Sequence, residues 1–292
     1  MASLQEDGLV VLHEKVAQQT YRLRIRSPGI AAEARAGQFV MVQVRKGIDP
    51  LLRRPFSFHR LLPAEDSIEL LYRVVGRGTW VLSKNPPGTI LSLFGPLGNG
   101  FLIPSPLPSK VVLVAGGIGI APFMELLQQL SARRRPGDGP PPRLIYGART
   151  AEELLPMEFL REVGASVSLA TDDGSLGYRG TVTQLLSLLA EKEGLEPGLL
   201  YACGPLAMQY GVARWVTERG VPAQLSLESL MACGLGACLG CALPAPHPKD
   251  PLQSRYVHVC KDGPVFEAGA VEWQKIQGQQ TITPTFPFSW DL

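Results

Sequence analysis

The sequence has no long apolar segment, and this absence is the first constraint on its class. No apolar stretch reaches the roughly 18 residues that a membrane-spanning helix needs. Residues 1–7 show no basic region followed by an apolar one, so no secretory signal is visible. We therefore expect a cytoplasmic protein, in which paired disulfides are disfavoured.

The chain also lacks an excess of charge of either sign. It has 28 basic and 26 acidic residues, a net charge of +2. Proteins that bind nucleic acid or anionic membranes usually carry a clear basic excess, so the composition predicts neither partner. The 292 residues, 45% of them apolar, suit two or three domains.

Cysteine is scarce, but four of the five cysteines fall within 28 positions. The four are Cys233, Cys238, Cys241 and Cys260. Their spacing, C-x4-C-x2-C followed by a distant cysteine, is that of plant-type ferredoxins, whose four thiolates hold a [2Fe–2S] cluster. Glycines between them would let backbone amides approach the sulfur atoms, because glycine tolerates crowded conformations. We therefore predict a [2Fe–2S] cluster on these cysteines.

Two other interpretations of the cysteines stay open. A zinc site could recruit His247 or His258, although the C-x4-C step is unusual for zinc. Four buried free thiols are the second alternative.

Residues 9–94 have the pattern of short strands. Three apolar residues in 21–25 alternate with arginines, a period of two that places one face inside and one in water. Further strand-like runs cover 39–44, 56–62 and 67–75. This pattern predicts an antiparallel barrel as a first domain, residues 1–105, ending in a Gly- and Pro-rich passage.

Residues 106–225 alternate strand and helix patterns instead. The run 111–115 is apolar throughout, as in a strand covered on both faces. Further strands are predicted at 143–146, 166–170 and 199–203, and helices at 123–130, 151–163 and 181–191. The alternation predicts an α/β domain with a parallel sheet and right-handed crossovers. Residues 226–292 are too short for a core of their own and form a predicted cluster segment with a C-terminal tail.

A glycine-rich turn follows the first apolar strand of the α/β region. The turn places Gly117, Gly119 and Pro122 between that strand and an amphipathic helix. Exposed amides and the positive helix end would bind a pyrophosphate there. A plain tight turn between strand and helix is the alternative.

Two more turns follow strands of the same region. Cys203, Gly204 and Pro205 end the strand at 199–203, where ligands of open α/β sheets bind, so we expect Cys203 to lie near a nicotinamide. Simple packing of the thiol is the other interpretation. Asp172 follows the strand at 166–170 and would bond ribose hydroxyls and repel a 2′-phosphate, favouring NAD over NADP. An ordinary acidic turn would have the same sequence.

The barrel region contains a candidate site for a second phosphate-bearing cofactor. Arginine grips phosphate with a bidentate fork, and a nearby glycine and hydroxyl could meet the rest of a pyrophosphate. Solvated arginines on a barrel rim are the alternative. The residues concerned are Arg54, Pro55, Phe56, Ser57, Tyr72, Arg73, Gly78 and Thr79.

In this order, the motifs resemble the ferredoxin–NADP reductase superfamily. The matching features are R-x-[YF]-S at 54–57, G-x-G-x-x-P at 117–122 and C-G-P at 203–205. The segments 52–55, 95–101, 171–175, 226–234 and 259–266 are similar, within that superfamily, to the electron-transfer subunits of dihydroorotate dehydrogenase B. The tail after Glu267 is longer than is usual in that group.

The resemblance implies an oxidoreductase subunit with three cofactors or substrates. FAD would bind the barrel at residues 54–57, Leu71, Tyr72, Arg73, Gly78 and Thr79, and NAD(H) the second domain. The implied partner is an FMN-containing catalytic subunit that oxidises dihydroorotate, in a heterotetramer of two plus two, for de novo pyrimidine (UMP) biosynthesis. No general acid or base is expected in this chain. The alternative is a related NAD(P)H reductase subunit serving ferredoxin, a hydrogenase or a sulfur reductase.

Overall fold

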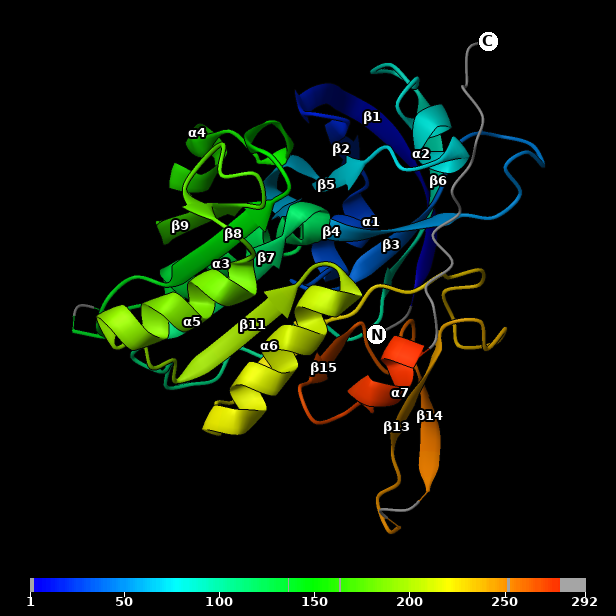
Figure 1. The fold of residues 1–292 in the computed structure, drawn as a ribbon. Helices are drawn as coiled ribbons and strands as arrows, with labels where there is room; N and C mark the ends of the chain where they lie inside the picture. The colour runs from blue at the N-terminus through cyan, green and yellow to red at the C-terminus, as the bar shows by residue number, and fades with distance from the viewer. Residues whose placement is uncertain (1–2, 136, 163, 251–252, 279–292) are drawn as a thin grey trace.

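The first part of the chain forms a closed antiparallel barrel in the computed structural model, which describes residues 3–135, 137–162, 164–250 and 253–278 (Figure 1). Its strands, in order around the barrel, are β1 (Leu4–Ala17), β2 (Thr20–Arg26), β5 (Ser67–Arg73), β4 (Arg54–Leu62), β3 (Phe39–Gln43) and β6 (Ile90–Leu97). Three short helical segments connect them: α1 (Pro28–Glu33), η1 (Pro63–Glu65) and α2 (Arg77–Leu82).

Alternation of side chains decides which face of each barrel strand is buried. In β2, Leu23 and Ile25 are completely buried while the alternating Arg22, Arg24 and Arg26 reach the surface. In β3, Val40 and Val42 point into the barrel core, whereas Phe39 and Met41 belong to the apolar cluster outside it. The barrel therefore has an apolar outer wall, which the rest of the chain covers.

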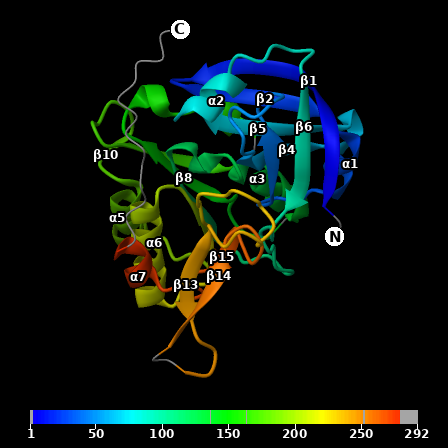
Figure 2. The same cartoon turned by 90° about the vertical axis from the view of Figure 1, so that its right-hand side faces the viewer.

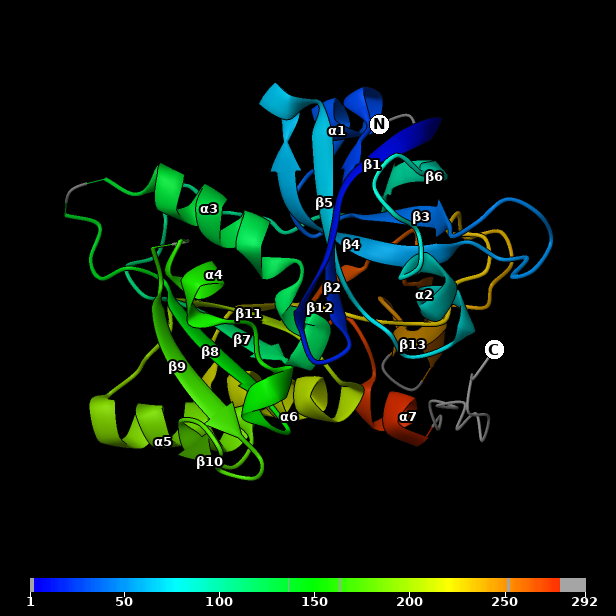
Figure 3. The same ribbon diagram turned by 90° about the horizontal axis from the view of Figure 1, so that it is seen from above.

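The second part is a seven-stranded sheet with helices on both faces. Its strand order is β10 (Tyr178–Arg179), β9 (Ser166–Thr171), β8 (Arg143–Ala148), β7 (Val111–Gly116), β11 (Leu199–Cys203), β12 (Ala223–Ser226) and β15 (Val265–Glu267). The first six strands are parallel, and β15 pairs antiparallel with β12. Helices α3 (Phe123–Arg133) and α4 (Met157–Arg161) cover one face, and α5 (Val182–Glu193) and α6 (Leu206–Arg219) the other (Figure 3).

The C-terminal segment shares its core with the α/β sheet. Val257 and Val259 pack in the same apolar cluster as Val212 of α6 and Leu225 of β12. The hairpin of β13 (Ala242–Pro246) and β14 (Ser254–His258) projects from the body, and α7 (Trp273–Gly278) lies beside it (Figure 2). The segment thus depends on the rest of the chain for its packing.

The predicted fold class is confirmed, with differences in particular elements. The helix predicted at 151–163 is wrong in its continuity, because a short η3 (Ala151–Glu153) and α4 flank Pro156, which cannot continue a helix. Helix α6 and strand β12 had no counterpart in the sequence prediction. The domain boundaries at 105/106 and 225/226 stay predictions, and residues 279–292 of the tail lie outside the described residues.

No helix in the described part of the chain combines the length and apolar character that crossing a bilayer requires.

Candidate functional site

One wall of the barrel connects the predicted flavin site with the cluster segment. Strands β3 and β4 pair so that Phe39 stands opposite Ser57 and Met41 opposite Pro55. Because paired strands lie about 4.8 Å apart, outward side chains at these positions are neighbours. The outward face of β4 carries predicted flavin residues, and that of β3 contacts the C-terminal segment.

The loop that carries the first cysteines packs directly on that wall. A Cβ atom at Gly234 would lie 2.9 Å from Cγ of Met41 and 3.2 Å from Cδ1 of Leu97, so only glycine allows this approach. Gly234 also has a φ of 76°, which disfavours other residues. The buried Cys241 and Cys260 belong to the same apolar cluster as Met41.

Backbone amides point at the sulfur atoms, as expected for thiolate ligands. Cys233 Sγ accepts hydrogen bonds from the N–H groups of Leu235 (3.3 Å) and Cys238 (3.4 Å). The bond from Leu235 is the main reason that the pKa of Cys233 falls to about 6. Cys260 Sγ accepts from the N–H of Gly236 at 3.1 Å, yet burial raises its pKa to about 12. Amides that converge on sulfur are a feature of iron–sulfur sites.

The donor set fits a two-iron cluster better than a single ion. Cys241 and Cys260 have their Sγ atoms 3.2 Å apart, and all four cysteines are free. Among the described residues, no three His, Cys, Asp or Glu side chains converge closely enough to hold one metal ion. In a [2Fe–2S] cluster each iron takes two of the four thiolates, so no three of them need to converge on one ion. Cys238 is exposed, which brings the site to the surface.

The two turns predicted to bind NAD(H) lie against each other. A Cβ atom at Gly119 would lie 2.3 Å from the carbonyl oxygen of Cys203, and one at Gly204 would lie 2.9 Å from the amide nitrogen of Gly116. Gly117 has a φ of 54° and open space around it. The glycine loop and the Cys-Gly-Pro turn therefore form one continuous edge of the sheet, in which Pro122 precedes the first residue of α3.

Three polar side chains gather at the end of β11 and β12. Cys203 and Ser226 are paired across the two strands, and burial raises the pKa of the Cys203 thiol far above its usual value. The nearby carboxylate of Glu228 adds to this shift. Glu228 is exposed to solvent, and partial desolvation raises the pKa of its carboxyl. The Cys203 thiol is therefore neutral near pH 7.

The structure distinguishes the two adjacent arginines of the barrel. Arg53 donates to the backbone oxygen of Ser92 at 2.6 Å and to its hydroxyl, so it stabilises the barrel. The guanidinium of Arg54 lies against Gly78, where a Cβ would come within 2.5 Å of Nε. Arg54 therefore adjoins the first turn of α2, as the proposed phosphate site requires, although the Thr79 hydroxyl already bonds the backbone of Val75 and Gly76.

The side chains of other predicted flavin residues pack in the barrel core or form an ion pair with the α/β domain. Phe56 and Tyr72 are buried in the barrel core with ring centroids 5.5 Å apart, and the Tyr72 hydroxyl bonds His13 at 2.8 Å. The Arg73 guanidinium bonds both carboxylate oxygens of Glu153 in the α/β domain, at 2.8 and 3.1 Å. The Arg73 charge is thus paired with a carboxylate in this structure, and its predicted contact with a phosphate stays a prediction.

The remaining predicted residues frame the sheet edge. Leu71 is buried against the apolar cluster that includes Ile120 and Ala121 of the nucleotide loop. Asp172 is exposed, with its backbone N–H bonded to Ala148 at the end of β8. Its neighbour Asp173 instead bonds the N–H and hydroxyl of Ser175. Of the two carboxylates, Asp172 is the one that faces outward from this edge without such a bond in the described structure.

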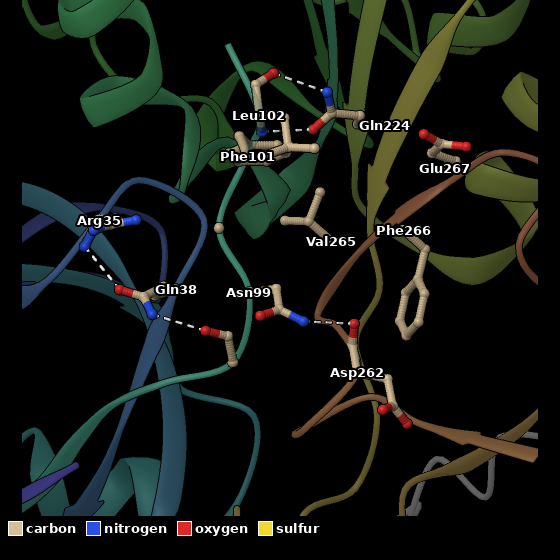
Figure 4. A pocket seen from close by; sticks show the side chains of 12 residues that line it. Arg35, Gln38, Asn99, Phe101, Leu102, Gln224, Asp262, Val265, Phe266 and Glu267 are labelled. Atoms are coloured by element: carbon tan, nitrogen blue, oxygen red, sulfur yellow. Dashed lines mark hydrogen bonds between the residues drawn. The ribbon is translucent and has the colours of Figure 1, made fainter. Parts of the chain in front are cut away.

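None of the predicted cofactor residues lines the cavity of about 400 Å³ shown in Figure 4. It opens where the segment 98–102 runs between the barrel and strands β12 and β15. Its polar groups largely bond the surrounding chain: Gln224 bonds both backbone groups of Leu102, and Asn99 donates to the carbonyl of Asp262. We interpret this cavity as a packing junction between the barrel, the segment 98–102 and strands β12 and β15.

Sequence reasoning missed residues that join the barrel to the α/β domain. His59, Glu125 and Glu153 are buried and bond across this boundary. A single polar residue inside a strand or helix belongs to no local sequence pattern from which a contact between domains could be predicted. The alternation of inward and outward positions in 54–59 was the available signal, because it places His59 on the side of Ser57.

Family models match two parts of the chain. The model described as the iron–sulfur cluster binding domain of dihydroorotate dehydrogenase B matches residues 228–272. The oxidoreductase NAD-binding domain matches residues 113–214. These matches include all four clustered cysteines and both turns of the nucleotide edge.

Curated relatives cover nearly the whole chain. The dihydroorotate dehydrogenase B (NAD(+)) electron transfer subunit of Desulforamulus reducens is 39% identical over 268 residues, 92% of this chain and 98% of that protein. The protein of the same name from Geobacillus kaustophilus is 38% identical, over 91% and 98%.

Solved structures share the architecture. The NADH-dependent reduced ferredoxin-NADP oxidoreductase, studied for flavin-based electron bifurcation, superposes with a TM-score of 0.78 at 29% identity, covering 93% of this chain and 91% of that one. The ferredoxin reductase of carbazole 1,9a-dioxygenase has a TM-score of 0.63 at 22% identity, covering 76% and 67%, and supports the fold alone.

Proposed function

The chain belongs to the family of dihydroorotate dehydrogenase B (NAD(+)) electron transfer subunits, which are oxidoreductases, and from this we propose its place in an electron relay. In this proposal it passes electrons between NAD(H), an FAD on the barrel and a [2Fe–2S] cluster on Cys233, Cys238, Cys241 and Cys260. The relay ends at the FMN of a catalytic partner subunit that oxidises dihydroorotate, in de novo pyrimidine biosynthesis.

The pairing of β3 with β4 is the observation that carries the proposal. Ser57 and Pro55 of the predicted flavin strand stand opposite Phe39 and Met41, and Met41 touches the cysteine loop at Gly234. A bound flavin supplies the exchange between two-electron and one-electron chemistry. The protein would contribute a short separation between the flavin and the cluster, because one barrel wall supports both cofactor sites.

The residues around the flavin site fit a nucleotide cofactor. Arg54 packs against Gly78 and donates from Nη1 to the carbonyl of Leu52 at 2.6 Å, so its remaining N–H groups would be the donors to a phosphate there. The Ser57 hydroxyl, on the outward face of β4, would face the flavin ring. On the other side, the joined turns at Gly119 and Cys203 would hold NAD(H), and Asp172 would select against a 2′-phosphate.

We expect the partner to dock over the cysteine loop. Leu230, Leu235 and Leu239 flank the cysteines with 75%, 51% and 61% of their surface exposed. Large apolar side chains grouped on a surface typically mark an interaction site. An FMN subunit seated there would lie next to the exposed Cys238, and two such pairs would form the proposed heterotetramer.

A second candidate function rests on the 29% identical reduced ferredoxin-NADP oxidoreductase, which covers 93% of this chain. In that alternative, the chain is a reductase subunit whose cluster exchanges electrons with ferredoxin, a hydrogenase or a sulfur reductase.

Co-expression with a candidate FMN subunit tests the choice. The proposal expects a stable complex with about two irons and one FAD per chain that reduces NAD⁺ with dihydroorotate. Leu235→Asp and Leu239→Asp should weaken the complex, because they put charge into an apolar contact, whereas Leu176→Asp, exposed on another surface, should not. No complex, together with rapid ferredoxin reduction by NADH, would favour the alternative.

A further inference from the structure

Strand β4 changes its register against β5 at His59. Phe58 pairs with Leu70 of β5 and Arg60 with Glu69, so the register shifts between them and His59 is a β-bulge. Bulges redirect a side chain out of the ladder. The His59 side chain is completely buried, on the side of the barrel that faces the α/β domain.

The His59 ring bonds the nucleotide loop itself. Its Nδ1 lies 3.0 Å from the carbonyl oxygen of Ala121, which directly follows η2 (Gly117–Ile120), the turn of the glycine loop. A carbonyl only accepts, so Nδ1 must carry the hydrogen and donate it. Burial lowers the pKa of His59 to about 4, which keeps the ring neutral and maintains this tautomer near pH 7.

A second bond from the same strand supports the first. Two residues after His59, the N–H of Leu61 donates to Oε2 of Glu125 at 2.9 Å. Glu125 is buried in the first turn of α3, and its other oxygen accepts from Gln129 at 2.8 Å. Strand β4 therefore holds both the end of the glycine loop and the helix that follows it.

Packing alone does not explain a histidine at this position. Its Nε2 has no hydrogen-bond partner in the described structure, and an unpaired buried acceptor is unfavourable for folding. A leucine would fill a buried site without that penalty. The bond from Nδ1 to Ala121 is thus the feature that the imidazole adds.

We propose that His59 is a positioning residue for hydride exchange between the flavin and the nicotinamide. Residues 54–57 at one end of β4 would hold the flavin, and His59 further along the same strand ties down the loop that would hold NAD(H). The two reacting atoms must approach to about 3–3.5 Å, and a shift of about 1 Å can slow a reaction by about a hundredfold. This inference rests on the FAD and NAD(H) sites of the proposed function.

Three variants of the full chain, purified with FAD and cluster, test the inference. His59→Leu removes the donor, His59→Asn keeps a donor where Nδ1 stands, and Arg60→Ala removes the neighbouring ion pair with the exposed Glu162. The readouts are the anaerobic stopped-flow rate of FAD reduction by NADH, the dissociation constant of NADH and the long-wavelength charge-transfer absorbance of reduced enzyme with NAD⁺.

We expect His59→Leu to slow FAD reduction about tenfold or more and to weaken the charge-transfer band, with FAD content and NADH affinity little changed. His59→Asn should recover most of the rate, and Arg60→Ala should stay within about twofold of wild type. A wild-type rate in His59→Leu, or no recovery in His59→Asn, would overturn the inference.

Two controls distinguish loss of the His59 bond from failure of the proposed function and from loss of FAD. If wild type itself is not reduced by NADH, the proposed function fails, whereas a reduced wild type with an equally fast His59→Leu contradicts only the role of His59. If His59→Leu does not retain FAD, Glu125→Gln serves instead, because it weakens the bonds of the Glu125 carboxylate to Leu61 and Gln129, which hold β4 against α3. We expect that variant to slow FAD reduction about threefold, and an unchanged rate would overturn the inference.

Discussion

At the scale of single residues, Cys203 and Cys233 differ in their chemistry. Cys203 is a buried neutral thiol at the nucleotide edge, whereas Cys233 accepts two backbone hydrogen bonds and favours the thiolate. Only a thiolate is a strong metal ligand. The two sites can therefore be disturbed separately.

Cys238→Ser should remove the cluster but leave the nucleotide edge intact. We expect iron content to fall well below two per chain and electron transfer to the partner to be lost, while NADH-dependent dye reduction through FAD stays within about twofold. Cys203→Ser should behave oppositely, with normal cluster absorbance and slower dye reduction. Iron analysis, visible spectra and the two assays provide the comparison, and equal loss of both activities in Cys238→Ser would show that the cluster mainly maintains the fold.

At the scale of elements, β15 fastens the cluster segment to the α/β sheet. It pairs antiparallel with β12, and Leu227 donates its N–H to the carbonyl of Pro264 just before β15 begins. Phe266 is buried in the shared core, and a Cβ at Gly263 would come within 2.2 Å of its ring. This edge strand is therefore both the end of the sheet and the base of the cysteine segment.

Phe266→Ala should loosen that base. Removing a buried phenylalanine typically destabilises a protein by about 3–5 kcal/mol, so we expect a loss of that order in urea unfolding. Iron should also be released faster to a chelator, because the loop with Cys260 loses its support. Tyr256→Ala on the projecting hairpin, 64% exposed, should stay within about 0.5 kcal/mol. If Phe266→Ala is destabilised but releases iron at the wild-type rate, the packing of β15 does not contribute to retention of the cluster.

At the scale of the whole molecule, ion pairs and hydrogen bonds hold the barrel in place on the α/β domain. The buried Glu153 carboxylate bonds Arg73 of the barrel and Arg149 of its own domain. The bond from Arg73 is the main reason that the pKa of Glu153 falls to about 2, from an ordinary 4.5. This pair lies on the same boundary as the bond between His59 and Ala121.

The depressed pKa of Glu153 predicts a specific dependence of stability on pH. A carboxylate whose pKa is lowered by folding stabilises the protein above pH 4.5 and loses this effect as the pH falls toward 2. Between pH 7 and pH 2.5, wild type should lose about 2–3 kcal/mol more unfolding free energy than Glu153→Gln. Urea unfolding measures the difference, with Cys238→Ser in both chains so that acid release of iron does not enter. Parallel pH curves would contradict the role of this ion pair.

The sequence by itself determined the local features of this protein and its fold class. The cysteine spacing, the glycine loop and the Cys-Gly-Pro turn are chemical patterns of adjacent residues, and the change from alternating to continuous apolar runs distinguished the barrel from the parallel sheet. The individual cofactor residues stay predictions. Pro156 shows the limit of periodicity, since one imino acid divided a region of helical pattern into two short pieces.

Only the tertiary structure decided which residues meet across the chain. Arg53 and Arg54 are adjacent and chemically alike, and the structure shows that Arg53 bonds Ser92 whereas Arg54 lies at Gly78. Strand β15 joins β12 across nearly forty residues, and His59 bonds Ala121 across 62 positions. Such contacts depend on burial and orientation fixed by distant elements, which no local pattern encodes. The cluster signature could therefore be recognised from cysteine spacing alone. The packing of the cysteine loop on Met41 and the β3–β4 wall of the barrel became visible only in the tertiary structure.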